Sequence, residues 1–186
     1  DYPMLAINCY DEKSDALVFD PYTVVEAAGH RVGVIGIAAT IVDKVMPASF
    51  SEGIYFTLGN LELPAIIEEL RREAQVDLIV VVSHLGFPQE MKLACEVDGI
   101  DVLLSGHTHN RVYQPALVND TIVFQSGCHG SFLGRLDLVI EGGTVVDFAH
   151  ELIVVEEQID PDPEVQALVD GALTPHRERL SRVVGH

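Results

Sequence analysis

Two apolar runs separated by a short amphipathic segment constrain the fold of this chain more than any other feature. The runs cover 76–83 and 100–104, and the segment between them, 88–97, carries apolar residues at helical spacing. This strand–helix–strand order is typical of a βαβ unit, in which the two strands are parallel and adjacent. We therefore expect an α/β fold whose sheet carries both runs side by side.

A histidine follows each of these two predicted strands. His84 comes directly after the first, and His107 and His109 lie in the sequence Gly-His-Thr-His just beyond the second. Ligands bind beyond the carboxyl ends of parallel strands, and imidazole is the commonest metal ligand in proteins. The three histidines are therefore predicted to form a metal centre at one edge of the sheet. A set of imidazoles without thiolates suits zinc, manganese or iron.

Three further polar residues are candidates for a substrate pocket beside this centre. Asn8 ends the first predicted strand, and Asn110 directly follows the histidine pair. His129 lies near two glycines at the end of another apolar run. We expect it to line the pocket rather than to bind a metal directly.

The composition excludes several classes of function. The chain has 29 acidic and 11 basic residues and a net charge of −18, so binding of a nucleic acid polymer through a basic patch is not expected. No apolar run is long enough to span a membrane. The cysteines, Cys9, Cys95 and Cys128, have no metal-site or disulfide spacing. Cys95 and Cys128 are interpreted as packing residues.

The remaining segments extend the sheet and end in a helix. A hairpin is predicted at 22–38, and a helix follows at 61–75. Four later runs predict an antiparallel meander that forms an outer sheet, namely 116–118, 121–125, 132–140 and 144–155. The Pro-rich segment 159–163 predicts a linker to an amphipathic helix at 164–184.

Two motifs carry a family resemblance. Val-Val-Ser-His-Leu-Gly at 81–86, followed by Gly-Ile-Asp-Val-Leu-Leu-Ser-Gly-His-Thr-His at 99–109, resembles the calcineurin-like dimetal phosphoesterases. The branch it resembles comprises 5′-nucleotidases and 2′,3′-cyclic-nucleotide phosphodiesterases, and Phe-Leu-Gly-Arg-Leu at 132–136 is similar to that branch too. The resemblance implies a partial four-layer metallophosphoesterase sandwich of mixed sheets with flanking helices. Residues 1–158 would be the C-terminal portion of a catalytic domain, and 159–186 a linker and helix leading to an absent C-terminal domain.

The same resemblance implies a chemistry. The intact enzyme would hold two divalent cations, zinc, manganese or iron, with His84 and His107 on one and His109 on the other. A bridging hydroxide would attack the phosphorus of a small phosphate ester or nucleotide, as in nucleotide catabolism. The dimanganese thiosulfohydrolases of sulfur oxidation share this layout and remain an alternative. Members of the 5′-nucleotidase branch are commonly exported, which implies a periplasmic or cell-surface location.

The chain departs from the family pattern in its missing motifs. The family's Asp-x-His, Gly-Asp-x-x-Gly and Gly-Asn-His-Asp/Glu motifs do not occur. The acid-assisting histidine is therefore absent, and the catalytic residues are unknown. Three histidines are too few for two cations, so the chain alone is expected to bind one cation or none and to be inactive. Two alternatives remain open: a non-catalytic binding module with a sealed surface, and a homo-oligomer paired through an exposed apolar face.

Overall fold

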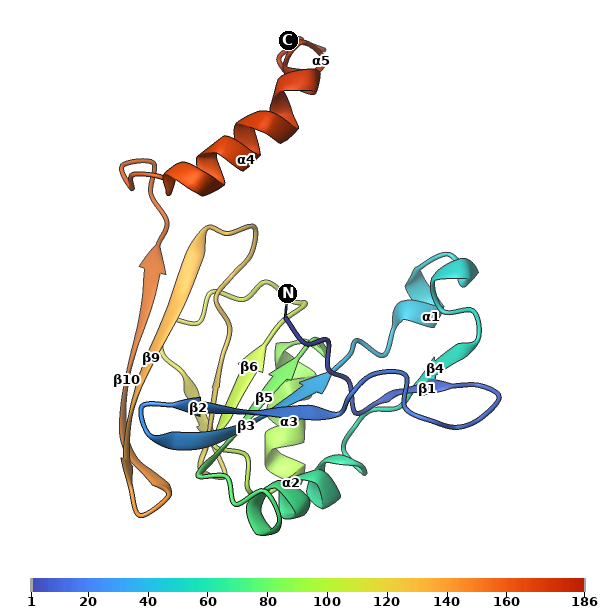
Figure 1. The fold of residues 1–186 in the computed structure, drawn as a ribbon, viewed down its shortest axis with the longest axis vertical. Coiled ribbons are helices and arrows are strands. Elements are labelled where there is room, and N and C mark those ends of the chain that lie inside the picture. The colour runs from blue at the N-terminus through green and yellow to red at the C-terminus, as the bar shows by residue number, and fades with distance from the viewer. Residues whose placement is uncertain (1, 186) are drawn as a thin grey trace. The chain divides into compact units, whose positions relative to one another are not determined.

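A six-stranded mixed sheet forms the centre of the fold (Figure 1). The computed structural model describes residues 2–185, and the chain divides into two compact units, Asp1–Val154 and Val155–His186. The strands of the sheet lie in the order β2 (Tyr22–Ala27), β3 (His30–Ile37), β5 (Leu78–Ser83), β6 (Val102–Ser105), β8 (Thr121–Phe124) and β7 (Ala116–Val118). The four inner strands are parallel, and β2 and β7 are antiparallel edge strands.

The predicted βαβ unit is confirmed. Strand β5, helix α3 (Phe87–Glu96) and strand β6 follow one another, and β5 pairs with β6 in parallel. Ser83 lies opposite Ser105 in the register, so both strands end at the same level. This register brings the residues that follow the two strands to one edge of the sheet.

The two faces of the sheet are covered differently. Side chains alternate between faces along a strand, so Leu103 and its neighbours Val102 and Leu104 point in opposite directions. On one face, Leu103 packs in a core with α3 and α2 (Leu63–Arg72), and Ile79, Val81 and Leu103 are 0% exposed. The other face packs against a separate hairpin, β9 (Phe132–Glu141) with β10 (Thr144–Val154).

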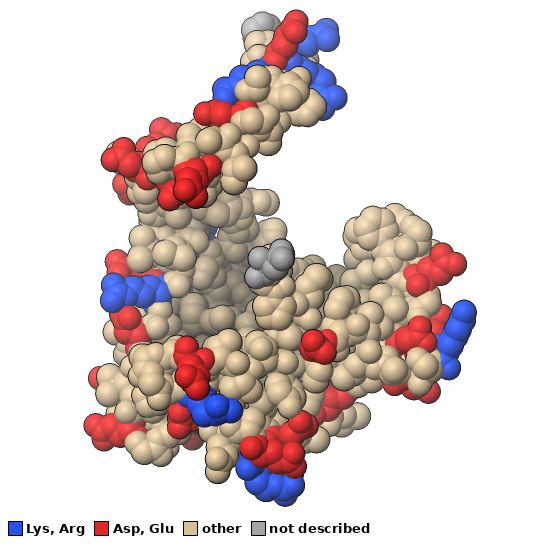
Figure 2. Space-filling model, in the orientation of Figure 1, with Lys and Arg blue, Asp and Glu red and all other residues tan. Residues whose placement is uncertain are grey.

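The hairpin leaves part of this second face open. Val25 on β2 and Val82 on β5 are 44% and 45% exposed, although both belong to apolar strands. A hollow of about 530 Å³ lies over this part of the sheet, between it and the chain around Leu5. On the face drawn in Figure 2, charged side chains lie mainly near the edges, with largely uncharged surface between them.

The predicted outer meander is wrong in one respect. Strand β8 does not join an outer sheet; it pairs in parallel with β6 in the main sheet, and β7 pairs beside it. All four residues of β8 are buried, as an inner strand covered on both faces requires. In β9, by contrast, half-buried and exposed residues alternate, which is the pattern of a strand with one face in water.

The N-terminal segment also differs from the prediction. The expected first strand contributes an isolated bridge, Leu5 to Asp20, and the strand that follows, β1 (Cys9–Asp11), pairs with β4 (Ile54–Phe56). A Cβ added at Gly36 would lie 2.1 Å from the carbonyl oxygen of Leu5, so only glycine lets this segment lie against β3. The segment before α2 also holds two short helices, α1 (Val42–Val45) and η1 (Ala48–Phe50).

The second unit is helical. It contains α4 (Pro163–Leu173), η2 (Thr174–His176) and α5 (Arg177–Leu180). The carboxylate of Asp162 caps α4 by accepting hydrogen bonds from the amides of Glu164 and Val165, at 2.9 and 3.1 Å. Among residues 2–185, no helix is both long and apolar enough to cross a membrane. The assignment of 159–186 as a lead-in to a further domain stays a prediction, and residue 186 lies outside the described residues.

The fold class, α/β with mixed sheets and flanking helices, is confirmed for the described chain. One packing prediction is wrong, because Cys95 in α3 is exposed rather than part of the core. The apolar face of α3 is instead made by Leu93 and Ala94.

Candidate metal centre

The structure brings the rings of His84 and His107 together at the carboxyl edge of β5 and β6. Their ring centroids lie 5.2 Å apart, with an angle of 66° between the ring planes. The amide of His84 donates to the carbonyl of Ile37 at 3.0 Å, which fixes its backbone to the end of β3. Two imidazoles that follow neighbouring parallel strands therefore lie in edge-to-face contact.

Gly106 makes this close approach feasible. A Cβ at position 106 would lie 2.7 Å from Nδ1 of His84 and 3.0 Å from the carbonyl oxygen of Ser83. Real Cβ atoms do not come this close to their neighbours, so a larger residue would push the His84 ring away. The glycine before His107 is therefore a requirement of the histidine pair.

Three histidines at this edge have strained backbones. His107, His109 and His129 have φ angles of +68°, +59° and +58°. This left-handed conformation costs a residue with a Cβ roughly 1–2 kcal/mol. Such strain is kept where the surrounding structure enforces it, and it concentrates at functional sites.

Gln125, which the sequence did not single out, holds the loop of His107 and His109 in place. It is 3% exposed, and its amide nitrogen donates to Oγ of Ser105 at 3.0 Å and to the carbonyl of Gly106. Its amide oxygen accepts hydrogen bonds from Oγ1 of Thr108, at 3.3 Å, and from the backbone amide of Asn110. A polar residue directly after the buried run of β8 was the available signal for this role.

The helix that follows His84 is held by similar contacts. Oγ1 of Thr108 accepts a hydrogen bond from the amide of Phe87 at 3.0 Å, so the histidine loop is tied to the start of α3. Glu90 is 0% exposed, and one of its carboxylate oxygens accepts from the amides of Leu85 and Gly86 at 3.1 and 3.2 Å. These contacts fix the backbone on both sides of His84 and His107.

The electrostatics keep His84 neutral. Removal of water by surrounding protein atoms lowers the pKa of His84 below its ordinary value. The charge that His107 and His109 carry when protonated lowers this pKa further, while the carboxylate of Glu90 opposes the change. A neutral imidazole is the form that binds a metal ion. The ring is therefore ready to act as a ligand at neutral pH.

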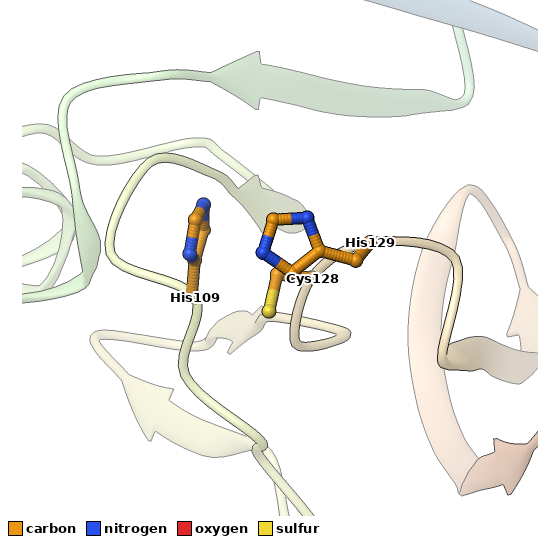
Figure 3. Close-up of side chains that lie close together, drawn as sticks. All are labelled: His109, Cys128 and His129. Carbon is orange, nitrogen blue, oxygen red and sulfur yellow. The ribbon is translucent and has the colours of Figure 1, made fainter. Parts of the chain in front are cut away.

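His109 lies in a second group, with His129 and Cys128. The His109 and His129 ring centroids are 5.4 Å apart, and one potential ligand atom from each of His109, Cys128 and His129 lies within 4.8 Å of the other two. Figure 3 shows the two rings side by side and steeply inclined to one another, with the thiol of Cys128 next to the His129 ring. Of the pocket candidates, His129 is thus close to a predicted ligand.

The two asparagines have different surroundings. Asn8 is 0% exposed; its Nδ2 donates to the carbonyls of Ala38 and Thr57 at 3.0 and 2.9 Å, and its Oδ1 accepts from the amide of Ala38 at 2.8 Å. These contacts give Asn8 a structural role and leave it no free group for a substrate. Asn110 is exposed, and its backbone carbonyl accepts from the amide of Gly127 at 2.8 Å, which ties the His109 loop to the His129 loop.

No protein-family model matches the chain. The trifunctional nucleotide phosphoesterase protein YfkN of Bacillus subtilis is 31% identical over 165 residues, which cover 86% of this chain and 11% of that protein. The 5′-nucleotidase of Vibrio cholerae is 24% identical over 196 residues, covering 89% of this chain and 35% of that protein. The chain thus spans about a tenth to a third of the length of these relatives.

A solved structure shows the same fold. The sulfate thiohydrolase SoxB of Thermus thermophilus, in complex with glycerol, superimposes with a TM-score of 0.88 at 27% identity, covering 95% of this chain and 32% of that one. The relatives confirm the family resemblance that the motifs at 81–86 and 99–109 carry.

Proposed function

We propose that this chain, a homologue of 5′-nucleotidases and calcineurin-like phosphoesterases, supplies part of a metal centre for the hydrolysis of phosphate esters. His84, His107 and His109 are the proposed ligands. The observation that carries the proposal is the 5.2 Å separation of the His84 and His107 rings at the matched ends of two parallel strands. A nucleotide or another small phosphate ester is the proposed substrate.

The donor set fits a divalent cation. Neutral imidazoles suit zinc, manganese or iron, and a bound cation of this kind polarises a phosphoryl oxygen and activates water. The chain's own residues position the ligands: Gly106 leaves room for the His84 ring, and Gln125 holds the loop that carries His107 and His109. This arrangement orients the ligands before a cation arrives.

The donor set does not suffice for two cations. The three proposed ligands are imidazoles, and the metal-ligating clusters among residues 2–185 include no carboxylate that could bridge two ions. We therefore propose that the chain by itself binds one cation through His84 and His107 and has little or no hydrolytic activity. The remaining ligands would come from polypeptide outside the 186 residues.

The partly exposed apolar face of the sheet helps to distinguish a part of a larger enzyme from a non-catalytic module or a homo-oligomer. A non-catalytic module with a sealed surface would cover its apolar strands, whereas Val25 and Val82 are nearly half exposed. These exposures favour a chain that packs against further polypeptide. Pairing of two copies through this face is the alternative, and sedimentation of the purified chain separates the two because only pairing doubles its mass.

A thiosulfohydrolase activity is the second candidate function. The structural likeness to SoxB favours it, with a TM-score of 0.88 over 95% of this chain. The substrate distinguishes the two functions. The periplasmic or cell-surface location rests on the family resemblance alone and is part of the same proposal.

Binding of a single cation is the direct test of the proposed function. Calorimetric titration of the chain with Mn²⁺ or Zn²⁺ should show a site that His84→Ala and His107→Ala each weaken by at least about tenfold. The variant His30→Ala, altered at the opposite end of β3, is the matched control and should bind like the unaltered chain. Equal binding by His84→Ala, His107→Ala and the control would contradict the proposal.

A further inference from the structure

We propose that His109, Cys128 and His129 form a site for a thiophilic divalent cation, with zinc as the preferred ion. The side chains come from two loops that follow β6 and β8, and they converge as Figure 3 shows. The site shares His109 with the proposed hydrolytic centre but needs neither His84 nor His107, so variants of His84 and of Cys128 distinguish the two. It gives Cys128 a function where the sequence indicated only packing.

The two loops are held together before any ion binds. The amide of Gly127 donates to the carbonyl of Asn110 at 2.8 Å, and Arg111 and Ser126 form an isolated bridge. The amide of Ser131 donates to the carbonyl of Cys128 at 3.1 Å and closes the turn that carries His129. These contacts place the segment after His109 beside the segment before Cys128.

Backbone conformation aims the side chains into the site. His109 and His129 both have positive φ angles, and so do Gly127 and Gly130 on either side of His129. Glycine tolerates this conformation, whereas the two histidines adopt it at a cost. The bonds that close the two loops hold this strained backbone and bring the two rings close to one another and to the thiol of Cys128.

The spacing is close to that of a bound zinc ion. With Zn–N bonds of about 2.0–2.1 Å and a Zn–S bond of about 2.3 Å, the ligand atoms of a tetrahedral site lie roughly 3.3–3.6 Å apart. The atoms here lie within 4.8 Å of one another, so an inward movement of about 1 Å completes the geometry. His109 and His129 are exposed and Cys128 is half-buried, which leaves the rings free to move and the site open to the ion.

The donor chemistry selects the ion. Thiolate with imidazole favours zinc over manganese, magnesium and calcium, which prefer carboxylate, carbonyl and water oxygens. Three protein ligands leave the fourth tetrahedral position open, as in zinc sites that bind water or substrate. The net charge of −18 adds a general attraction for cations. The site therefore takes up zinc in preference to the oxygen-seeking ions.

Cobalt provides a spectroscopic test that does not depend on activity. Titration of the full chain with Co²⁺ should produce the intense near-ultraviolet charge-transfer band of a cobalt–thiolate bond. Cys128→Ser should abolish this band, and His129→Gln should weaken Co²⁺ and Zn²⁺ binding at the site by at least about tenfold. Circular dichroism of each variant checks that it is folded.

Two control variants make the test decisive. Cys95→Ser removes an exposed cysteine on α3 and should leave the band unchanged, as should His84→Ala. A band that survives Cys128→Ser, or that is lost in Cys95→Ser, overturns the proposed site. A band lost in His84→Ala but not in Cys128→Ser also overturns it, because the thiolate would then come from another cysteine.

Discussion

The two histidine groups at this sheet edge differ in what positions them. His84 and His107 follow strands whose register ends at the same level, and the amide of His84 is bonded to the end of β3. His109 and His129, with Cys128, sit on loops and depend on strained backbone and on bonds between the loops. The comparison teaches that the end of a parallel strand fixes the backbone of His84 directly, whereas ligands on loops, His107 included, also depend on the contacts of Gln125.

The largest expected effect is on the pair His84 and His107, which follow the ends of β5 and β6. Gly106→Ala places a Cβ 2.7 Å from Nδ1 of His84, so the ring must move or the end of β6 must shift. Overpacking of this kind should lower the free energy of unfolding by roughly 1–3 kcal/mol. It should also weaken cation binding at His84 and His107 by about 10- to 100-fold. Chemical denaturation and calorimetric titration measure the two effects.

A matched substitution isolates the role of the close contact. Gly171 lies in α4 with no atom near the position of a Cβ, so Gly171→Ala should leave cation binding unchanged. It should leave the unfolding of the first unit unchanged too. If Gly106→Ala behaved like Gly171→Ala in both measurements, the contact between Gly106 and His84 would not be what defines the pair.

The next effect tests whether loops need a support that strands do not. Gln125→Ala removes four hydrogen bonds around Gly106, Thr108 and Asn110 and should cost roughly 1–3 kcal/mol of unfolding free energy. Cobalt binding at Cys128 should weaken more than cation binding at His84 and His107, because His109 lies on the loop that Gln125 holds and Cys128 and His129 follow Gln125 directly, whereas His84 lies at the separate end of β5. Parallel titrations of both sites measure the difference.

Gln89→Ala is the control for this prediction. Gln89 is an exposed residue of the helix α3. Its replacement should change the free energy of unfolding by no more than about 0.5 kcal/mol. Equal weakening of both sites in Gln125→Ala would remove the distinction between loop and strand.

The smallest effect concerns pH. The folded protein lowers the pKa of His84, so the unfolded chain takes up a proton at this residue first as the pH falls below about 6.5. The free energy of unfolding should therefore decrease as the pH falls from the ordinary pKa to the lowered one, and His84 contributes no pH dependence above that window. Denaturation at a series of pH values measures this slope.

His84→Gln should remove this part of the slope. His176→Gln, altered in the second unit, should retain it. If the pH dependence of His84→Gln matched that of the unaltered chain, the lowered pKa of His84 would not be the cause of the slope.

The sequence predicted the pair His84 and His107 because the spacing of apolar residues and the strand–helix–strand order are enough to place the ends of two parallel strands. The burial of both faces of β8 was missed, since a short apolar run does not reveal whether it lies in an inner or an outer sheet. Asn8 ends an apolar segment much as His84 does, yet the structure turns its side chain toward backbone groups of Ala38 and Thr57. Which way a polar residue at a segment end points depends on packing that the sequence does not show.

The group on the loops, His109, Cys128 and His129, was harder to predict from the sequence. The proximity of Cys128 and His109 depends on positive φ angles and on Gln125, and a single sequence does not specify either. The glycines at 127 and 130 indicated a tight turn but not its direction. His129 was placed in the pocket, whereas its neighbour Cys128 was interpreted as packing, because no spacing rule links a cysteine to a histidine nineteen residues earlier.

The central claim is that neighbouring strand ends hold one cation through His84 and His107. Nuclear magnetic resonance of the imidazoles during Zn²⁺ titration of the Cys128→Ser chain tests it most directly, because the thiolate is removed. The account predicts that the His84 and His107 resonances move together and saturate with one ion, while those of His30 and His176 do not move. Resonances of His84, His107 and His109 that all stay in place as zinc is added would contradict it.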